Sequence, residues 1–311
     1  MIQVENLTKK FGSFTAVDNI SFSIKHGEVV GFLGPNGAGK STTMRMITGY
    51  YSPTDGNINL GKTNVVKNPT DAKKHIGYLP ENSPAYKDMI PIDFLRFIAS
   101  LRGIKKNDRK NAIDRVINIC SLEPVLYQQI DTLSKGFLQR VCLAQAIIHD
   151  PPYLILDEPT DGLDPNQKRG IRKLIKDMGK DKTIMISTHI LEEINACCSR
   201  VIVISKGRIV ADGTEEYLKK KSDTYKTVVF KTNHPIKKKV LYKQNSKIKD
   251  IVSTKNSDSI QFRLIPKNHD DIASILFDVS NYIRANNISI IEFYVDNGNL
   301  SEAFQTITEN K

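Results

Sequence analysis

A loop between residues 34 and 41 carries the strongest chemical signal in the sequence. Its residues are Gly34, Pro35, Asn36, Gly37, Ala38, Gly39, Lys40 and Ser41. This order fits G-x-x-x-x-G-K-[ST], a pattern whose glycines let backbone N–H groups point at phosphate oxygens. We expect Lys40 to reach the β- and γ-phosphates, Ser41 to hold Mg²⁺ through its hydroxyl, and Thr42 to contact phosphate. The loop therefore predicts a site for a nucleoside triphosphate.

Two acids follow the apolar run 153–156, at the point where a parallel strand is expected to end. Carboxylates in this position lie at the edge where open α/β sheets bind ligands. We expect Asp157 to orient Mg²⁺ and Glu158 to polarise the attacking water. His189 lies just past a second apolar run, residues 183–187. Its ring is expected to contact the γ-phosphate and the same water.

The elements that must position these residues are short apolar runs alternating with helical patterns, from Met1 to about Glu216. Continuous apolar runs are typical of strands that are buried on both faces of a parallel sheet. Such runs cover residues 29–33, 153–156, 183–187 and 201–205. Helical patterns cover residues 41–48, 92–101, 111–120, 136–149, 166–178 and 191–197. The alternation predicts an α/β fold with a largely parallel sheet.

The length of 311 residues suggests two domains. We expect a first domain at residues 1–216, a linker at 217–225 and a small C-terminal α+β domain at 226–311. Within the second domain, strands are expected at 227–231, 251–255, 260–265 and 288–295, and helices at 270–285 and 300–308.

The net charge of the chain is +11, from 45 basic and 34 acidic residues. Such an excess favours an anionic partner, and an uneven solvated surface is the alternative. Eleven lysines and a single acid, Asp223, lie between Lys219 and Lys249. This stretch is open to three interpretations: a solvated linker, a surface for anionic lipid headgroups, or a contact with nucleic acid.

No apolar run approaches the ~18–20 residues that span a bilayer. The N-terminus also lacks the basic and apolar regions of a signal peptide. We therefore expect a cytoplasmic protein, and a function at a membrane would require another chain to supply the span.

A further motif opens the helical pattern that begins near residue 136. It reads Leu133-Ser134-Lys135-Gly136-Phe137-Leu138-Gln139-Arg140. It resembles LSGGQ-x-QR, the signature of ATP-binding-cassette (ABC) ATPases. The order of all the motifs, ending with Gly162-Leu163-Asp164 and Ser187-Thr188-His189, is similar to that family over about residues 1–216. The resemblance implies a P-loop NTPase fold of the ABC type, with a helical subdomain.

The resemblance also implies that two cassettes sandwich two ATP molecules head to tail. Four signature residues would then contact ATP on the opposite subunit: Ser134, Lys135, Gly136 and Phe137. By the same resemblance, Phe11 stacks on adenine and Asp164 lies in a loop that contacts the partner cassette.

Two positions depart from the family pattern. Lys135 replaces a signature glycine, which adds bulk and charge near phosphate. Glu81 stands where the family usually has a glutamine that contacts Mg²⁺ and senses the membrane partner. A carboxylate is also a possible Mg²⁺ ligand, because its oxygens are hard donors.

The resemblance is greatest to the ATPase subunits of ABC-2-type exporters, including the gliding-motility subgroup. It implies an ATPase that uses ATP and Mg²⁺ and powers a polytopic permease from the cytoplasmic face of the membrane, as a peripheral protein. The dimer would be a homodimer or a heterodimer with a related cassette. Two alternatives remain: an ABC-type ATPase that acts on nucleic acid or ribosomes, for which the sequence offers little support, and a weakly hydrolysing regulatory cassette.

Overall fold

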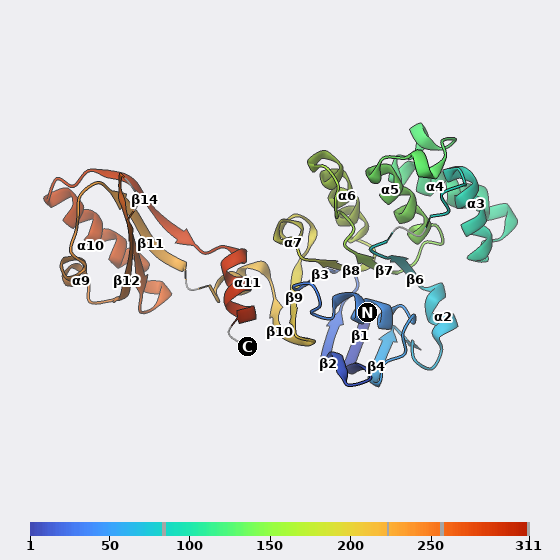
Figure 1. The fold of residues 1–311 in the computed structure, drawn as a ribbon, viewed down its shortest axis with the longest axis horizontal. Coiled ribbons are helices and arrows are strands. Elements are labelled where there is room, and N and C mark those ends of the chain that lie inside the picture. The colour runs from blue at the N-terminus through green and yellow to red at the C-terminus, as the bar shows by residue number, and fades with distance from the viewer. Residues whose placement is uncertain (83–84, 223, 256–257, 310–311) are drawn as a thin grey trace. The chain divides into compact units, whose positions relative to one another are not determined.

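The computed structural model describes residues 1–82, 85–222, 224–255 and 258–309. The chain divides into two compact units, Met1–Glu215 and Glu216–Lys311 (Figure 1). The segment 217–225, expected to be a linker, holds regular structure at both ends. It contains the end of α8 (Glu215–Lys219) and the first residue of β11 (Tyr225–Thr232).

A six-stranded sheet in the order β10-β9-β3-β8-β7-β6 forms the centre of the first unit. All its neighbouring strands are parallel except β10, which pairs antiparallel with β9. The strands are β3 (Val29–Leu33), β6 (Ile76–Leu79), β7 (Tyr153–Asp157), β8 (Thr183–Thr188), β9 (Arg200–Ser205) and β10 (Arg208–Gly213). The expected parallel sheet and α/β class are confirmed.

Alternate side chains of the central strands enter two different hydrophobic cores. Leu154 and Leu156 of β7 join the core beneath the helical part of the unit, whereas Ile155 joins the core on the opposite face. This follows from the two-residue period of a strand. It also explains why these strands read as continuous apolar runs.

A second sheet of the first unit is antiparallel and has the order β2-β1-β4-β5. Its strands are β1 (Ile2–Phe11), β2 (Phe14–Ile24), β4 (Asp55–Leu60) and β5 (Thr63–Asn64). The sequence did not predict this sheet. Register shifts interrupt the pairing of β1 with β2, so the alternation of buried and exposed residues is irregular.

Helices cover the central sheet and build the helical subdomain, which Figure 1 shows around α3, α4 and α5. The first unit holds α1 (Lys40–Ile47), α2 (Pro69–Lys74), α3 (Pro91–Leu101), α4 (Lys106–Cys120), α5 (Lys135–Ile147), α6 (Pro165–Met178) and α7 (Leu191–Cys197), with short 3₁₀ turns at Glu123–Val125 and Ile130–Thr132. None of the helices within the described residues is both long and apolar enough to cross a membrane.

The second unit is an antiparallel sheet in the order β12-β13-β11-β14, with its own hydrophobic core. Its other elements are α9 (Lys238–Gln244), β12 (Ile248–Lys255), β13 (Ile260–Pro266), a 3₁₀ turn (His269–Asp271), α10 (Ile272–Ala285), β14 (Ile290–Asn297) and α11 (Leu300–Glu309). Helix α9 lies within the lysine-rich stretch and was not predicted. Its Leu241 is fully buried, which anchors the exposed lysines on this unit.

Candidate functional site

Three neighbouring strands end at one edge of the central sheet and place the predicted chemical groups there. Leu33, the last residue of β3, pairs with Thr188 of β8, and Ser187 of β8 pairs with Asp157 of β7. The phosphate loop therefore begins beside His189, and Asp157 lies one strand away. This is the edge where open parallel sheets bind ligands.

The phosphate loop runs from the end of β3 into α1 and requires glycine at its closest approaches. Gly39 has a φ of +106°, and a Cβ there would lie 2.6 Å from the Ala16 carbonyl oxygen. A Cβ on Gly34 would lie 2.4 Å from the carbonyl oxygen of Ile204. Glycine is therefore needed at Gly34 by close packing and at Gly39 also by its left-handed backbone.

The loop borders a cavity of about 380 Å³. Its lining residues are Phe14, Ala16, Asn36, Gly37, Gly39, Lys40, Ser41, Thr42, Glu81 and Glu158. Gly34, Pro35 and Ala38 do not line it. Ala38 is instead buried in the core between the two sheets.

Lys40 is held at the centre of the loop. Its Nζ donates to the carbonyl oxygens of Gly34 at 2.8 Å and Pro35 at 3.2 Å, and lies 4.0 Å from Oε1 of Glu158. Burial lowers the pKa of Lys40, whereas the nearby carboxylates of Glu158, Asp157 and Glu81 raise it. A cation in this position is arranged to neutralise a bound phosphate.

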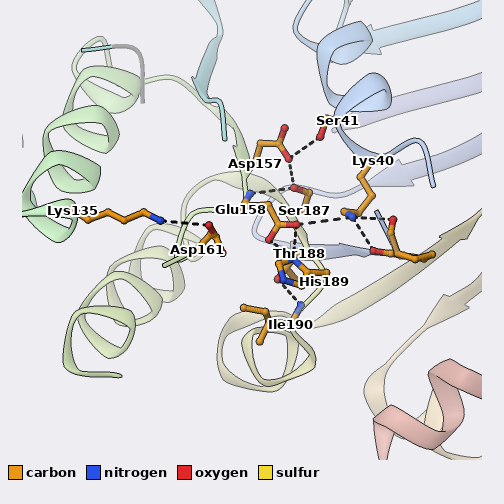
Figure 2. Close-up of polar contacts among 12 residues, drawn as sticks. Lys40, Ser41, Lys135, Asp157, Glu158, Asp161, Ser187, Thr188, His189 and Ile190 are labelled. Carbon is orange, nitrogen blue, oxygen red and sulfur yellow. Dashed lines mark hydrogen bonds and ion pairs between the residues drawn. The ribbon is translucent and has the colours of Figure 1, made fainter. Parts of the chain in front are cut away.

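Asp157 carries the group best suited to a metal ion. It is 1% exposed, and its Oδ1 accepts hydrogen bonds from Ser187 Oγ and, at 3.4 Å, from Ser41 Oγ (Figure 2). Its buried Oδ2 has no hydrogen-bond partner within the described residues. A carboxylate with a free oxygen beside a serine hydroxyl fits Mg²⁺, which takes few protein ligands and keeps phosphate oxygens and waters. The described residues contain no group of three or more metal-ligating side chains.

Glu158 and His189 form a direct pair. His189 Nδ1 lies 3.0 Å from both Oε1 and Oε2 of Glu158. The Glu158 side chain is 10% exposed and that of His189 is 44% exposed. Glu158 has a φ of 49°, so its backbone is left-handed. Its backbone N–H donates to the carbonyl oxygen and to the hydroxyl oxygen of Ser187, at 3.2 Å each. Strain of this kind costs about 1–3 kcal/mol and is often found at functional sites.

Sequence reasoning missed two residues of this site. Ser187 orients both Asp157 and Glu158, and the sequence placed it in the motif Ser187-Thr188-His189 without assigning it a role. Phe14 lines the cavity and is 62% exposed. By contrast Phe11, the expected adenine-stacking residue, lies outside the cavity lining and packs edge-on against Tyr51, with ring centroids 5.7 Å apart.

The signature residues are not among those that line this cavity. Ser134 is the N-cap of α5 and accepts from Phe137 N at 3.3 Å. The Lys135 side chain is exposed and its Nζ lies 3.5 Å from Oδ2 of Asp161 (Figure 2). Gly136 is buried, and a Cβ there would displace the end of the Gln167 side chain, whose Cδ would lie 2.3 Å away.

Asp164 and Glu81 are placed differently from each other. Asp164 is the N-cap of α6, because its Oδ1 accepts from the backbone N–H groups of Asn166 and Gln167 at 2.9 Å each. Glu81 is exposed and lines the cavity. Glu81, expected to sense the membrane partner, lies in the segment between β6 and α3, which includes residues 83 and 84, outside the described residues.

The site thus combines a phosphate-binding loop, a buried lysine, a hydroxyl and carboxylate suited to Mg²⁺, and a glutamate paired with a histidine. These are the groups that phosphoryl transfer to water needs: charge neutralisation, positioning, and a base near the attacking oxygen.

Comparison with known proteins points in the same direction. A family model described as "ABC transporter" matches residues 17–161. The bacitracin transport ATP-binding protein BcrA of Bacillus licheniformis is 38% identical over 227 residues, which cover 72% of this chain and 73% of BcrA. The probable multidrug ABC transporter ATP-binding protein YbhF of Escherichia coli is 36% identical over 71% of this chain, but the match covers only 38% of YbhF.

Two solved structures share the fold of the first unit. An ATP-binding subunit of an ABC transporter is 28% identical, with a TM-score of 0.65, over 71% of this chain and 92% of the other. The cassette MJ0796, in a dimeric post-hydrolysis state with bound ADP and Pi, is 25% identical, with a TM-score of 0.63, over 69% of this chain and 98% of the other.

Proposed function

Because this chain belongs to the ATP-binding proteins of ABC transporters, we propose that it binds and hydrolyses ATP to drive transport through a membrane partner. The observation that carries the proposal is the convergence of five side chains at one sheet edge: Lys40, Ser41, Asp157, Glu158 and His189. The cavity beside them is lined by the phosphate loop and Glu158.

The geometry suggests a role for each residue. Lys40 exchanges its contacts with Gly34 and Pro35 for the β- and γ-phosphates. Glu158 accepts a proton from the attacking water, and His189 holds that carboxylate in place through Nδ1 and contacts the γ-phosphate. Since little covalent chemistry is required of the protein, positioning and electrostatic stabilisation supply most of the rate.

Ser41 and Asp157 are the proposed Mg²⁺ ligands, with Glu81 as a possible third. A bound Mg²⁺ neutralises charge on the β- and γ-phosphates. Since Oδ1 of Asp157 accepts from Ser187 and its Oδ2 has no hydrogen-bond partner among the described residues, the Asp157 carboxylate would keep an oxygen available for the ion.

We propose a head-to-tail dimer, with itself or with a related cassette, in which Ser134, Lys135, Gly136 and Phe137 contact ATP on the opposite subunit. The exposure of Ser134 and Lys135 supports this arrangement, because neither lines the cavity of its own chain. The dimeric state of the MJ0796 cassette supports it too.

An exporter of the ABC-2 type is the proposed transport system. The support is the similarity to BcrA, whose name describes bacitracin transport, and to YbhF, a probable multidrug transporter protein. The permease is the expected partner, and the protein is expected at the cytoplasmic face of the membrane. The gliding-motility subgroup stays a prediction.

A phosphate-release assay tests the proposed reaction. The purified chain is expected to release phosphate from ATP with saturation kinetics, and chelation of Mg²⁺ with EDTA should reduce release to background. ATP binding without any release would favour the regulatory alternative. Co-purification with ribosomes in place of membranes would favour the alternative that acts on nucleic acid.

A second test asks which aromatic side chain stacks on the adenine base of ATP. Phe14→Ala is expected to weaken ATP binding by about 1–3 kcal/mol, which is a rise in Kd of about 5- to 160-fold, because Phe14 lines the cavity and base stacking is worth that much. Affinity for inorganic tripolyphosphate, which has no base, should not change. Phe11→Ala is the matched control, and a larger loss for Phe11→Ala than for Phe14→Ala would assign stacking to Phe11. Isothermal titration calorimetry measures both.

A further inference from the structure

The side chain of Lys135 reaches from the first turn of α5 to the loop that leads from Glu158 to Asp164. Its Nζ lies 3.5 Å from Oδ2 of Asp161 (Figure 2). A Cβ built on Gly162 would lie 1.9 Å from this Nζ and 2.9 Å from Cε of the same lysine, so the end of the side chain lies against the Gly162 backbone. The ammonium is therefore held by a loop of its own chain.

This loop is connected to the proposed general base. The backbone N–H of Asp161 donates to the carbonyl oxygen of Glu158 at 3.2 Å, which closes a tight turn. A second contact from α5 reaches the same turn, because Gln139 Nε2 donates to the carbonyl oxygen of Pro159 at 3.0 Å. Leu163 is buried in the core beneath the helical part of the unit, whereas Asp161 is exposed. The ion pair is thus the exposed part of a contact between α5 and the turn that begins at Glu158.

The position of Lys135 in α5 is unfavourable for a cation. Ser134 is the N-cap, Lys135 is the first helical residue, and the first turn, residues 135–138, contains no acidic residue. Because the N-terminus of a helix carries a partial positive charge, it repels a lysine and attracts an anion. The helix end and the lysine together therefore favour an anion, and Asp161 supplies one from the same chain.

Burial fixes neither partner of this ion pair. The Lys135 side chain is 58% exposed and that of Asp161 is 54% exposed. Exposed ion pairs contribute little to stability, because water screens both charges. The pair can therefore open easily, and an anion of higher charge at the end of α5 would take the lysine from Asp161. In the proposed dimer that anion is the ATP bound by the opposite subunit.

We propose that Asp161 holds Lys135 in the single cassette and releases it to the ATP of the opposite subunit when the dimer closes. The carboxylate thus competes with that ATP for the ammonium, and the competition sets how tightly two ATP-bound cassettes associate. Opening the pair also removes one contact between α5 and the turn that begins at Glu158. This inference rests on the proposed function, and in particular on the head-to-tail dimer.

Zero-length cross-linking tests the ion pair directly, because a water-soluble carbodiimide joins an amine to a carboxylate only where the two are in contact. In the Glu158→Gln chain, which should not consume ATP, mass spectrometry is expected to find a cross-link between residues 135 and 161 without nucleotide. Formation of the Mg-ATP dimer should remove most of it. The exposed pair of Lys180 and Asp177, 3.0 Å apart, is the internal control and should cross-link equally in both states. No 135–161 cross-link without nucleotide, or an undiminished one in the dimer, would overturn the proposal.

Four further variants, made in the same Glu158→Gln background, measure the competition: Asp161→Asn, Lys135→Met, their double variant and the control Asp177→Asn. Asp161→Asn is expected to lower the dissociation constant of the ATP-bound dimer by about 4- to 25-fold, since an exposed pair is worth about two- to fivefold and two pairs open in each dimer. The Kd for ATP of the single cassette should not change in Asp161→Asn, because Asp161 does not line the cavity. Lys135→Met should weaken the dimer, and Asp177→Asn should leave it unchanged.

The double variant separates this competition from a general effect of charge. Where the Lys135 ammonium is already absent, the loss of the Asp161 carboxylate should have no effect, so the double variant should match Lys135→Met. Analytical ultracentrifugation gives the dissociation constants. A dimer that Asp161→Asn does not tighten, or a double variant that gains as much over Lys135→Met as Asp161→Asn gains alone, would overturn the proposal.

The side chains of Lys135 and Asp161 are both more than half exposed, so these variants are expected to fold as the wild type does, which circular dichroism checks. A wild-type chain that releases no phosphate and forms no dimer with ATP would remove the proposed function together with this inference. A chain that does both, with a dimer that Asp161→Asn leaves unchanged, would remove the inference alone.

Discussion

Replacing Glu158 with glutamine is expected to reduce ATP hydrolysis by about 100-fold or more, because loss of a general base typically costs a factor of about 10²–10⁴. An amide has nearly the same shape as the carboxylate and can remain beside His189, but it does not accept a proton at neutral pH. The Glu158 side chain is only 10% exposed, so bulk water has little access to take over its role as proton acceptor. ATP affinity should stay the same or rise, because a negative charge is removed from the cavity that receives the phosphates.

Two measurements check this result. Phosphate release under saturating Mg-ATP gives kcat, and light scattering after size exclusion should detect an ATP-bound dimer that persists because it does not turn over. Asp177→Asn, which alters an exposed carboxylate on α6, is the matched control and should behave as the wild type. Wild-type hydrolysis in Glu158→Gln would show that another group activates the water.

Loss of Lys40 should act on binding rather than on turnover alone. Lys40→Met removes the one lysine of the phosphate loop, and two charge-assisted hydrogen bonds to phosphate at about 1.5–3 kcal/mol each are lost with it. We expect the Kd for ATP to rise by at least about 100-fold. Calorimetric titration with Mg-ATP measures the change.

The control for this variant is Lys62→Met, which removes an exposed lysine from the first unit and should leave the Kd unchanged. Circular dichroism establishes that Lys40→Met is folded, which matters because the substitution leaves the Gly34 and Pro35 carbonyl oxygens without the ammonium that they accept from. ATP affinity within threefold of the wild type would contradict the assigned role.

The parallel strands could be read from the sequence, because strands buried on both faces are continuous in apolar residues. The run Val29–Leu33 coincides with β3, and all five of its residues are buried. The antiparallel strand β1 could not be read in this way. Its buried Val4 and Leu7 are three residues apart, which breaks the two-residue alternation, and polar residues near its end face solvent.

The parts of the site that neighbouring residues in the sequence form could be predicted. A loop of fixed spacing and two acids after an apolar run are local features. Contacts between distant segments were not predictable, as the adjacent pair Glu192 and Glu193 illustrates. One side chain is 86% exposed and its neighbour is buried, and only the packing of α7 against α6 decides which.

The two charged side chains at the centre of the site are both held by other groups of the protein. Lys40 is bound by two carbonyl oxygens, and Glu158 is bound by His189. Triphosphate binding is therefore expected to replace the carbonyl partners of Lys40 with phosphate oxygens, while the fold already sets the position of the side chain. Ordering a flexible side chain on binding costs about 0.5–1.5 kcal/mol of conformational entropy. Because folding already orders both side chains, ATP binding does not include this entropy cost. A larger share of the free energy of each phosphate contact therefore contributes to the affinity for ATP.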